Sequence, residues 1–165
     1  MLQKLLVTGA TGFIAMHCIV DLLNHGYQVK GTVRKIDGEE HVRSVIKKYS
    51  HNTENLEITR AELTDPQSWE VAMQGCHGVL HIASPVPVIQ PKDENKVIKP
   101  AIKGTINVLK AAYKFNVSRV VLTSSVSAVW GQGHKGSRIY SESDWTDTND
   151  PDQTPYSLSK TLAEK

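Results

Sequence analysis

The chain has little of what marks a secreted, membrane-spanning or metal-binding protein. Its two cysteines, Cys18 and Cys76, lie far apart, so a disulfide framework is not indicated. The seven histidines show no metal-ligand spacing, and no metal site is expected. The apolar start of the chain is interrupted by glycines, and no uncharged run of about 18 residues follows, which argues against a signal peptide and a membrane span. These absences favour a reducing, cytoplasmic setting.

The chain also lacks a basic block. Its formal net charge is +2 at pH 7, and the lysines and arginines are scattered along its whole length. Proteins that bind nucleic acid or anionic lipid usually have clustered lysines and arginines, so neither nucleic acid nor a membrane surface is expected as a partner. No repeat, linker or low-complexity tract is present. The 165 residues suit one domain with a real hydrophobic core.

Short apolar, often β-branched runs alternate with helical patterns. The runs that read as strands cover residues 4–8, 27–33, 55–61, 78–83 and 119–124. Helical patterns follow the first strand as far as Gly26, recur around residues 42–46 and 97–115, and start again at Asp65-Pro66, a capping residue followed by proline. Strand and helix in alternation predict a doubly wound α/β domain, in which helices cover both faces of a parallel sheet.

The stretch TGATGFIA follows the first predicted strand and opens a helix. In such a unit Gly9 permits the tight turn, Gly12 lets the backbone approach a pyrophosphate, and the small Ala15 lets the helix pack closely on the sheet. The N–H groups at the helix start, at Phe13 and Ile14, then bind the phosphates. The alternative is a purely structural turn. The position between strand and helix favours a dinucleotide site.

The residue type at the end of the second predicted strand indicates which dinucleotide is bound. A site specific for NAD expects an acidic residue there, which bonds the ribose 2′-hydroxyl. This chain instead has Arg34 followed by Lys35. A guanidinium matches the geometry of a 2′-phosphate, so Arg34 favours NADP as the cofactor. The alternative is that Arg34 is a solvated charge at the end of a strand.

Three residues form a candidate catalytic set. Tyr156 and Lys160 are four apart in a predicted helix, so their side chains share a face. That spacing is common by chance, so the pair is evidence for a catalytic site only together with other residues. Ser125 is such a residue, because it follows the fifth predicted strand at the edge where open α/β sheets bind ligands. Serines also simply end strands. A tyrosine donates a proton efficiently near neutral pH when a nearby ammonium stabilises its phenolate.

Several motifs together resemble the extended short-chain dehydrogenase/reductase superfamily, and most closely its dihydroflavonol reductase-like branch. They are VTGATGFIA, GVLHIASP, VIKPAIKGTINVLKAA, RVVLTSS and YSLSKTLAEK. The resemblance implies a Rossmann fold and an oxidoreductase that uses NADPH to reduce an aldehyde or ketone. It makes Ser125 the hydrogen-bond donor to the substrate carbonyl, Tyr156 the acid, and Lys160 its partner and a ligand of the nicotinamide ribose.

The resemblance also assigns further cofactor contacts. The family's Asp-Leu after the third strand, which contacts adenine, is Glu62-Leu63 here, and the longer acid leaves that contact open. Ala83 and Ser84 match the segment that passes the cofactor's ribose. A lysine that assists phosphate binding in plant members has no clean counterpart near His41, so the preference for NADP depends mainly on Arg34.

Two other functions share parts of this pattern. A sugar-nucleotide epimerase or dehydratase has the same fold, glycine loop and Tyr/Lys pair but uses tightly bound NAD, which Arg34 disfavours. A non-catalytic dinucleotide sensor has no need of the three residues of the catalytic set together. The substrate, its stereochemistry and the oligomeric state are not indicated by the sequence.

The polar segment from Gly131 to Pro155 has the length of a functional or disordered loop. Trp130, Tyr140 and Trp145 bracket it, and the sequence leaves open whether they line a substrate pocket or anchor the loop to the sheet. The chain then ends within a helical pattern capped by Thr154.

Family members are roughly twice as long as this chain, a two-domain size. We therefore expect residues 1–165 to form the N-terminal NADP-binding domain, without the last strands and the substrate lobe. The helix that bears Tyr156 and Lys160 should then have little against which to pack its apolar face, and short helices are marginal without tertiary contacts. Weak NADP binding and no turnover are expected of this polypeptide alone.

Overall fold

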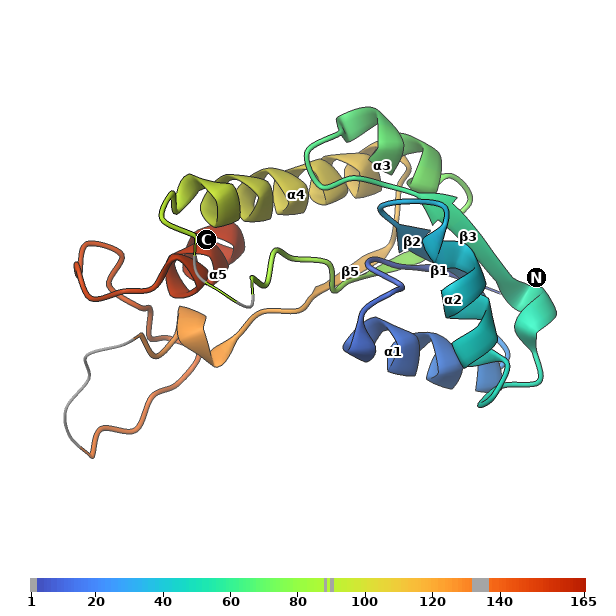
Figure 1. Cartoon of the computed structure of the whole chain (residues 1–165), viewed down its shortest axis with the longest axis horizontal. Coiled ribbons are helices and arrows are strands. Elements are labelled where there is room, and N and C mark those ends of the chain that lie inside the picture. The colour runs from blue at the N-terminus through green and yellow to red at the C-terminus, as the bar shows by residue number, and fades with distance from the viewer. Residues whose placement is uncertain (1–2, 88, 90, 132–136) are drawn as a thin grey trace. The chain divides into compact units, whose positions relative to one another are not determined.

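The computed structural model describes residues 3–87, 89, 91–131 and 137–165 (Figure 1). The chain divides into two compact units. The first unit comprises Met1–Ala83 and Asn107–Thr123, and the second comprises Ser84–Ile106 and Ser124–Lys165. Each unit is described by itself below. No helix among the described residues combines the length and the apolar character that crossing a bilayer requires.

The first unit contains a five-stranded sheet in which neighbouring strands pair in parallel. The strands are β1 (Lys4–Val7), β2 (Gln28–Val33), β3 (Leu56–Arg60), β4 (Gly78–His81) and β5 (Arg119–Leu122). Their order is β3-β2-β1-β4-β5, so β1 lies between β2 and β4. The direction of winding reverses at β1, and open α/β sheets bind ligands at this point, outside the carboxyl ends of the strands.

Helices cover both faces of this sheet, as predicted. They are α1 (Phe13–Asn24), α2 (Gly38–Ile46), α3 (Pro66–Met73) and the second half of α4 (Asn95–Lys114). Successive strand residues point to opposite faces. Val7 therefore packs with α1 and α2, whereas Leu6 packs with α3 and α4. Figure 1 shows α1 and α3 on opposite sides of the strands.

The sequence patterns predicted these elements closely. Each observed strand lies within its predicted run and is at most two residues shorter at either end. Asp65 caps α3 as expected, because its carboxylate accepts hydrogen bonds from the N–H groups of Gln67 and Ser68. Pro66 follows at the first helical position. The doubly wound α/β architecture is confirmed.

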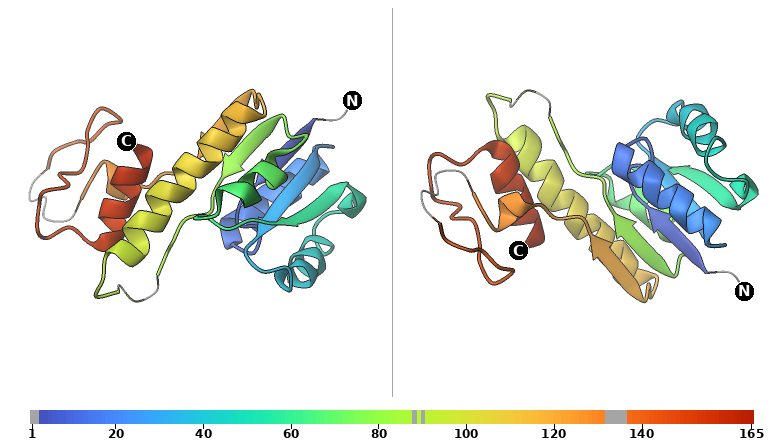
Figure 2. Two further views of the ribbon diagram at one scale, coloured as in Figure 1. Left: turned by 90° about the horizontal axis from the view of Figure 1, so that it is seen from above. Right: turned by 90° about the horizontal axis from the view of Figure 1, so that it is seen from below.

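The second unit contains the first half of α4, the short 3-10 helix η2 (Val126–Ala128) and α5 (Pro155–Glu164). Thr154 caps α5 through a hydrogen bond from the N–H of Ser157 to its hydroxyl, as predicted. The views in Figures 1 and 2 agree that η2, in orange, lies beside α5, in red. Helix α5 contacts η2 through polar groups, the hydroxyls of Ser157 and Thr161 on the carbonyl of Ser127.

Candidate functional site

The glycine loop after β1 adopts a backbone that only glycine accepts easily at one position. Gly9 has φ of 73°, in the left-handed region. A Cβ added there would lie 3.2 Å from the Cβ of Ala83, which follows β4. The loop is also fixed to β2, because the N–H of Gly9 donates to the Thr32 hydroxyl and that of Ala10 to the Thr32 carbonyl. Gly9 and Ala83 thus meet where the winding of the sheet reverses.

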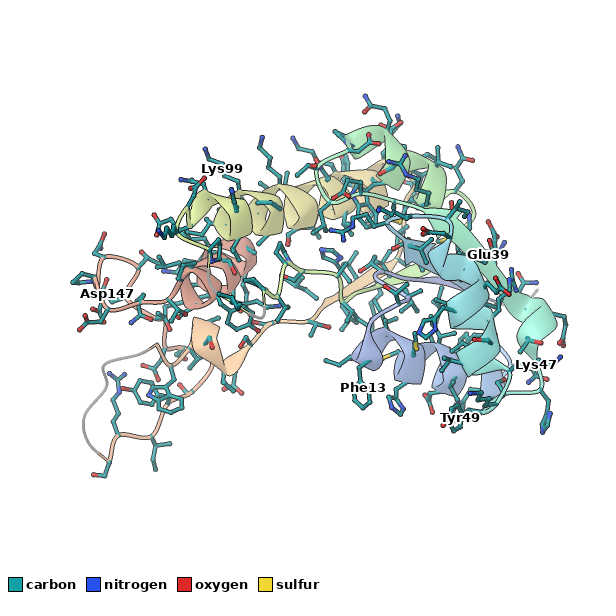
Figure 3. The ribbon with its side chains drawn as sticks, viewed as in Figure 1. Phe13, Glu39, Lys47, Tyr49, Lys99 and Asp147 are labelled. Atoms are coloured by element: carbon teal, nitrogen blue, oxygen red, sulfur yellow. The ribbon has the colours of Figure 1, made fainter. Side chains whose placement is uncertain are left out.

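The start of α1 is open to an anion. Gly12 occupies the N-cap position, and no acidic residue stands in the first turn to neutralise the positive end of the helix dipole. Phe13 and Ile14 follow and are 79% and 53% exposed, and Figure 3 shows Phe13 projecting away from the strands. Ala15 is fully buried. The arrangement leaves backbone N–H groups at the helix start directed toward the carboxyl edge of β1.

Arg34 directly follows β2 at the same edge of the sheet. Its side chain is exposed, and it makes no hydrogen bond or ion pair with the residues that the structure describes. Lys35 beside it is exposed as well. A cation that the protein does not neutralise, placed at the carboxyl end of the second strand, is suited to bind a negatively charged group from solution.

The segment after β3 departs from the arrangement that an aspartate would give. A carboxylate oxygen of Glu62 accepts a hydrogen bond of 2.9 Å from the N–H of Leu63, so the longer side chain turns back onto its own backbone. The amide of Asn107, on α4, donates to the Leu63 carbonyl at 2.9 Å. Sequence reasoning missed Asn107, because a contact across 44 residues leaves no local pattern.

In the second unit, Ser125 stands immediately before η2 and caps it. Its hydroxyl oxygen accepts a hydrogen bond of 3.1 Å from the N–H of Ser127. A hydroxyl that accepts through its oxygen still has its own proton to donate. Ser125 is therefore able to donate that proton to a carbonyl oxygen while its position remains fixed by the backbone.

Helix α5 is fixed to η2 through hydroxyl groups. The carbonyl of Ser127 accepts hydrogen bonds from the hydroxyls of Ser157, at 3.1 Å, and Thr146, at 2.8 Å. Thr161 is fully buried one turn after Ser157, and its hydroxyl donates to the Ser157 carbonyl. Tyr156 and Lys160 precede these two residues by one position each, so they form the neighbouring stripe of the same helix.

Lys160 is buried, at 6% exposure, whereas Tyr156 is half-buried. Burial lowers the pKa of the Lys160 ammonium, and the carboxylate of Glu164, one turn further along α5, partly opposes that shift. The carboxylate of Glu164 also accepts a hydrogen bond from the hydroxyl of Ser124. Ser124 directly precedes Ser125, so this bond joins the segment of one candidate catalytic residue to the helix of the other two.

The remaining predicted positions lie in the second unit. Ser84 is half-buried at its start. In the polar segment, of which residues 132–136 lie outside the described range, the Lys165 ammonium lies 5.1 Å from the ring centre of Trp145. Because Lys165 belongs to the end of the chain and not to a strand, this contact does not anchor Trp145 to the sheet. Among the described residues, no group of three or more His, Cys, Asp or Glu side chains could hold a metal ion.

Comparison with known proteins places this geometry in a family. Residues 6–165 match the model of the 3-beta hydroxysteroid dehydrogenase/isomerase family. The chain belongs to this family. Its relatives include reductases of the dihydroflavonol type, which confirms the resemblance to that branch of the extended short-chain dehydrogenases/reductases.

Three similar proteins illustrate the match. The anthocyanidin reductase ((2S)-flavan-3-ol-forming) of Vitis vinifera is 42% identical over an alignment of 171 positions that covers 96% of this chain and 48% of that protein. The bifunctional dihydroflavonol 4-reductase/flavanone 4-reductase of Malus domestica is 37% identical and covers 99% and 48%. The crystal structure of Gre2 from Candida albicans in complex with NADPH has a TM-score of 0.85 and 32% identity, covering 98% and 51%. The chain thus spans about half the length of these relatives.

Proposed function

We propose that this chain supplies the cofactor-binding loop and the proton-donating residues of an NADPH-dependent reductase of aldehydes or ketones. The observation that carries the proposal is the glycine loop at the reversal point of the sheet, with Arg34 at the neighbouring strand end in place of an acid. The kinship with dihydroflavonol and anthocyanidin reductases supports the same reading.

The residues present fit an NADP dinucleotide. A Cβ at Gly9 would lie 3.2 Å from the Cβ of Ala83, and one at Gly12 would lie 3.2 Å from the Gly9 carbonyl oxygen, so a side chain at either position would be tightly crowded. The absence of side chains at Gly9 and Gly12 lets a pyrophosphate approach the N–H groups of Phe13 and Ile14. Arg34 would bind the 2′-phosphate through its fork of N–H donors. In the dihydroflavonol reductase-like pattern, Leu63, Ala83 and Ser84 line the rest of the cofactor path.

The adenine contact of Glu62 is the weakest part of this fit. One carboxylate oxygen is already engaged by the N–H of Leu63. We therefore propose that Glu62 mainly holds the backbone after β3 through its bond to the N–H of Leu63. Asn107 holds the same segment through the Leu63 carbonyl.

The second unit supplies the groups for proton transfer. NADPH, when bound, supplies the hydride. The hydroxyl of Tyr156 donates its proton to the carbonyl oxygen as that oxygen gains negative charge, and the hydroxyl of Ser125 donates a hydrogen bond to the same atom. The ammonium of Lys160 stabilises the phenolate that remains and, by the family pattern, bonds the nicotinamide ribose.

The test is NADPH consumption by the full-length protein with a panel of aldehydes and ketones, run beside NADH and beside UDP-sugars. The proposal expects oxidation of NADPH that requires a carbonyl compound. Conversion of a UDP-sugar without net consumption of NADPH would identify an epimerase or dehydratase instead. NADPH binding without turnover of any compound would favour the dinucleotide sensor.

A further inference from the structure

A buried histidine lies beside the glycine loop without any part in the proposed chemistry. His81 is the last residue of β4 and is 2% exposed. Its Nδ1 lies 2.9 Å from the hydroxyl oxygen of Thr8, the residue before Gly9. The indole of Trp69, on α3, meets the imidazole edge to face with ring centres 6.0 Å apart. Neither of these two neighbours carries a charge.

Counting protons on the Thr8 hydroxyl decides which partner donates. Its oxygen accepts hydrogen bonds from the N–H groups of Ile82 and Ala83, both at 2.9 Å. A hydroxyl has two lone pairs and one proton. Both lone pairs are occupied, so the third bond must use the hydroxyl proton, and Nδ1 of His81 must be its acceptor. The imidazole is therefore neutral and protonated on Nε2.

This bond acts on the candidate cofactor loop. Thr8 is fully buried and joins the end of β1 to the segment after β4. Ala83, which Thr8 fixes after β4, is also the residue that a Cβ at Gly9 would approach to 3.2 Å. The hydroxyl of Thr8 has a single orientation when His81 accepts its proton, and that orientation leaves both lone pairs for the backbone.

We infer that His81, as the neutral ring protonated on Nε2, is a positioning residue that fixes the glycine loop of the cofactor site through Thr8. The cofactor part of this inference rests on the proposed function. His81 touches no reacting atom, and its role is to keep the distance between the loop and Ala83 at the value that admits a dinucleotide. A ring protonated on Nδ1 would present a donor to a hydroxyl whose lone pairs are already engaged.

Long-range ¹H–¹⁵N NMR of the imidazole rings in the purified protein tests the inference without any variant or cofactor. We expect Nδ1 of His81 to be unprotonated and Nε2 protonated at neutral pH. A proton on Nδ1 would overturn the inference. His77 is the matched internal reference, because its Nδ1 accepts the N–H of Lys4 at the opposite end of β4.

Two substitutions then connect the ring to cofactor binding. His81→Asn keeps an acceptor near the position of Nδ1, whereas His81→Leu removes it. We expect the dissociation constant for NADP to stay within about twofold in His81→Asn and to rise about tenfold in His81→Leu, the usual effect of stranding one buried hydrogen-bonding group. His77→Leu should leave it unchanged. Equal loss in both His81 variants would overturn the inference. Failure of the wild-type protein to bind NADP would refute the proposed function and leave the NMR result standing.

Discussion

The buried residues of the sheet in the first unit and those of helix α5 in the second unit differ in kind. In the first unit, apolar side chains such as Ile19, Val29 and Ile46 are fully buried on one face of the sheet, and Leu6 and Met73 on the other. In the second unit, the buried residues of α5 are polar: Ser157, Ser159, Lys160 and Thr161. The candidate cofactor loop thus stands on an apolar scaffold, and the candidate catalytic helix depends on directional hydrogen bonds.

The difference has an energetic side. Burying one large aliphatic side chain contributes about 1.5–3 kcal/mol, whereas a typical intramolecular hydrogen bond contributes about 1 kcal/mol net. Helix α5 is therefore expected to open locally at lower free energy than the sheet. Hydrogen bonds fix a direction more sharply than apolar contacts do, which suits a helix whose side chains must align with a reacting carbonyl.

The buried lysines show the same contrast. In the first unit, Lys30 donates to the carbonyl of Gln74 at 3.1 Å and lies 3.2 Å from the carboxylate of Glu57. In the second unit, burial lowers the pKa of Lys160, and the carboxylate that opposes the shift, on Glu164, is exposed. The charge of Lys30 is thus paired with a carboxylate, and burial disfavours the charged form of Lys160.

Removing the hydroxyl of Tyr156 should have the largest effect, because it should change turnover, assigned to the second unit, and leave cofactor binding, assigned to the first unit. We expect Tyr156→Phe in the full-length protein to lose about 10²- to 10⁴-fold in turnover, the usual contribution of one general acid, and to keep its affinity for NADPH. Steady-state kinetics and cofactor titration measure the two effects. Tyr113→Phe, at an 88% exposed position on α4, is the control and should keep normal turnover. Unimpaired turnover in Tyr156→Phe would exclude its assigned role.

A methyl group added to Gly9 should weaken cofactor binding by the first unit, because it crowds Ala83. Gly9 and Gly26 both have a positive φ, but a Cβ meets Ala83 at 3.2 Å at Gly9 and nothing within 4 Å at Gly26. Each change to alanine should cost about 1–2 kcal/mol of stability from the left-handed backbone alone. Only Gly9→Ala should also weaken NADP binding, measured by titration. Equal cofactor affinity in the two variants would refute the close approach at this loop.

Replacing Lys160 by methionine should test whether burial of its charge costs stability. Because the pKa of Lys160 in the folded state lies below the unfolded value, burial of its charge costs stability at neutral pH, and that cost fades as the pH rises through the folded pKa. We expect the stability of Lys160→Met relative to the wild type to fall as the pH rises from neutral to alkaline, and the variant to lose turnover. Lys30→Met is the control and should be destabilised. Urea unfolding at neutral and alkaline pH measures the difference, and a stability difference between Lys160→Met and the wild type that does not change with pH would contradict the account.

The smallest expected effect concerns one hydroxyl of α5. Ser157→Ala removes a donor to the Ser127 carbonyl, which keeps its bond from Thr146. A loss of about 1 kcal/mol, or about 2–4 °C in Tm, should follow, with faster hydrogen exchange in α5 than in the sheet. Ser143→Ala, at an exposed position, is the control. An unchanged Tm and unchanged exchange in Ser157→Ala would show that hydroxyl contacts do not fix this helix.

Local patterns predicted most of the first unit. Alternating strands and helices, the capping of α3 by Asp65 and the turn at Gly9 all follow from residues within a few positions of each other. The position of Arg34 at a strand end was likewise readable, because it requires only that the second strand end where its apolar run ends.

Contacts between distant segments were not predictable. The attachment of α5 to η2 joins residues 30 positions apart through hydroxyls, which the sequence displays as ordinary serines and threonines. The turned-back carboxylate of Glu62 and the bond between Thr8 and His81 depend on backbone geometry and strand register, which no spacing rule supplies. Burial of Lys160 was also not expected from its place in a polar helix.

The preference of the cofactor loop for NADP over NAD is the most direct test of the account. Dissociation constants for both dinucleotides should be measured in the wild-type protein, in Arg34→Ala and in Lys35→Ala, the neighbouring exposed cation. We predict that the wild type prefers NADP and that Arg34→Ala reduces this preference about tenfold or more by weakening NADP alone, since a charge-assisted hydrogen bond to phosphate is lost. Lys35→Ala should change the ratio far less. An unchanged ratio in Arg34→Ala would contradict the assignment of this site.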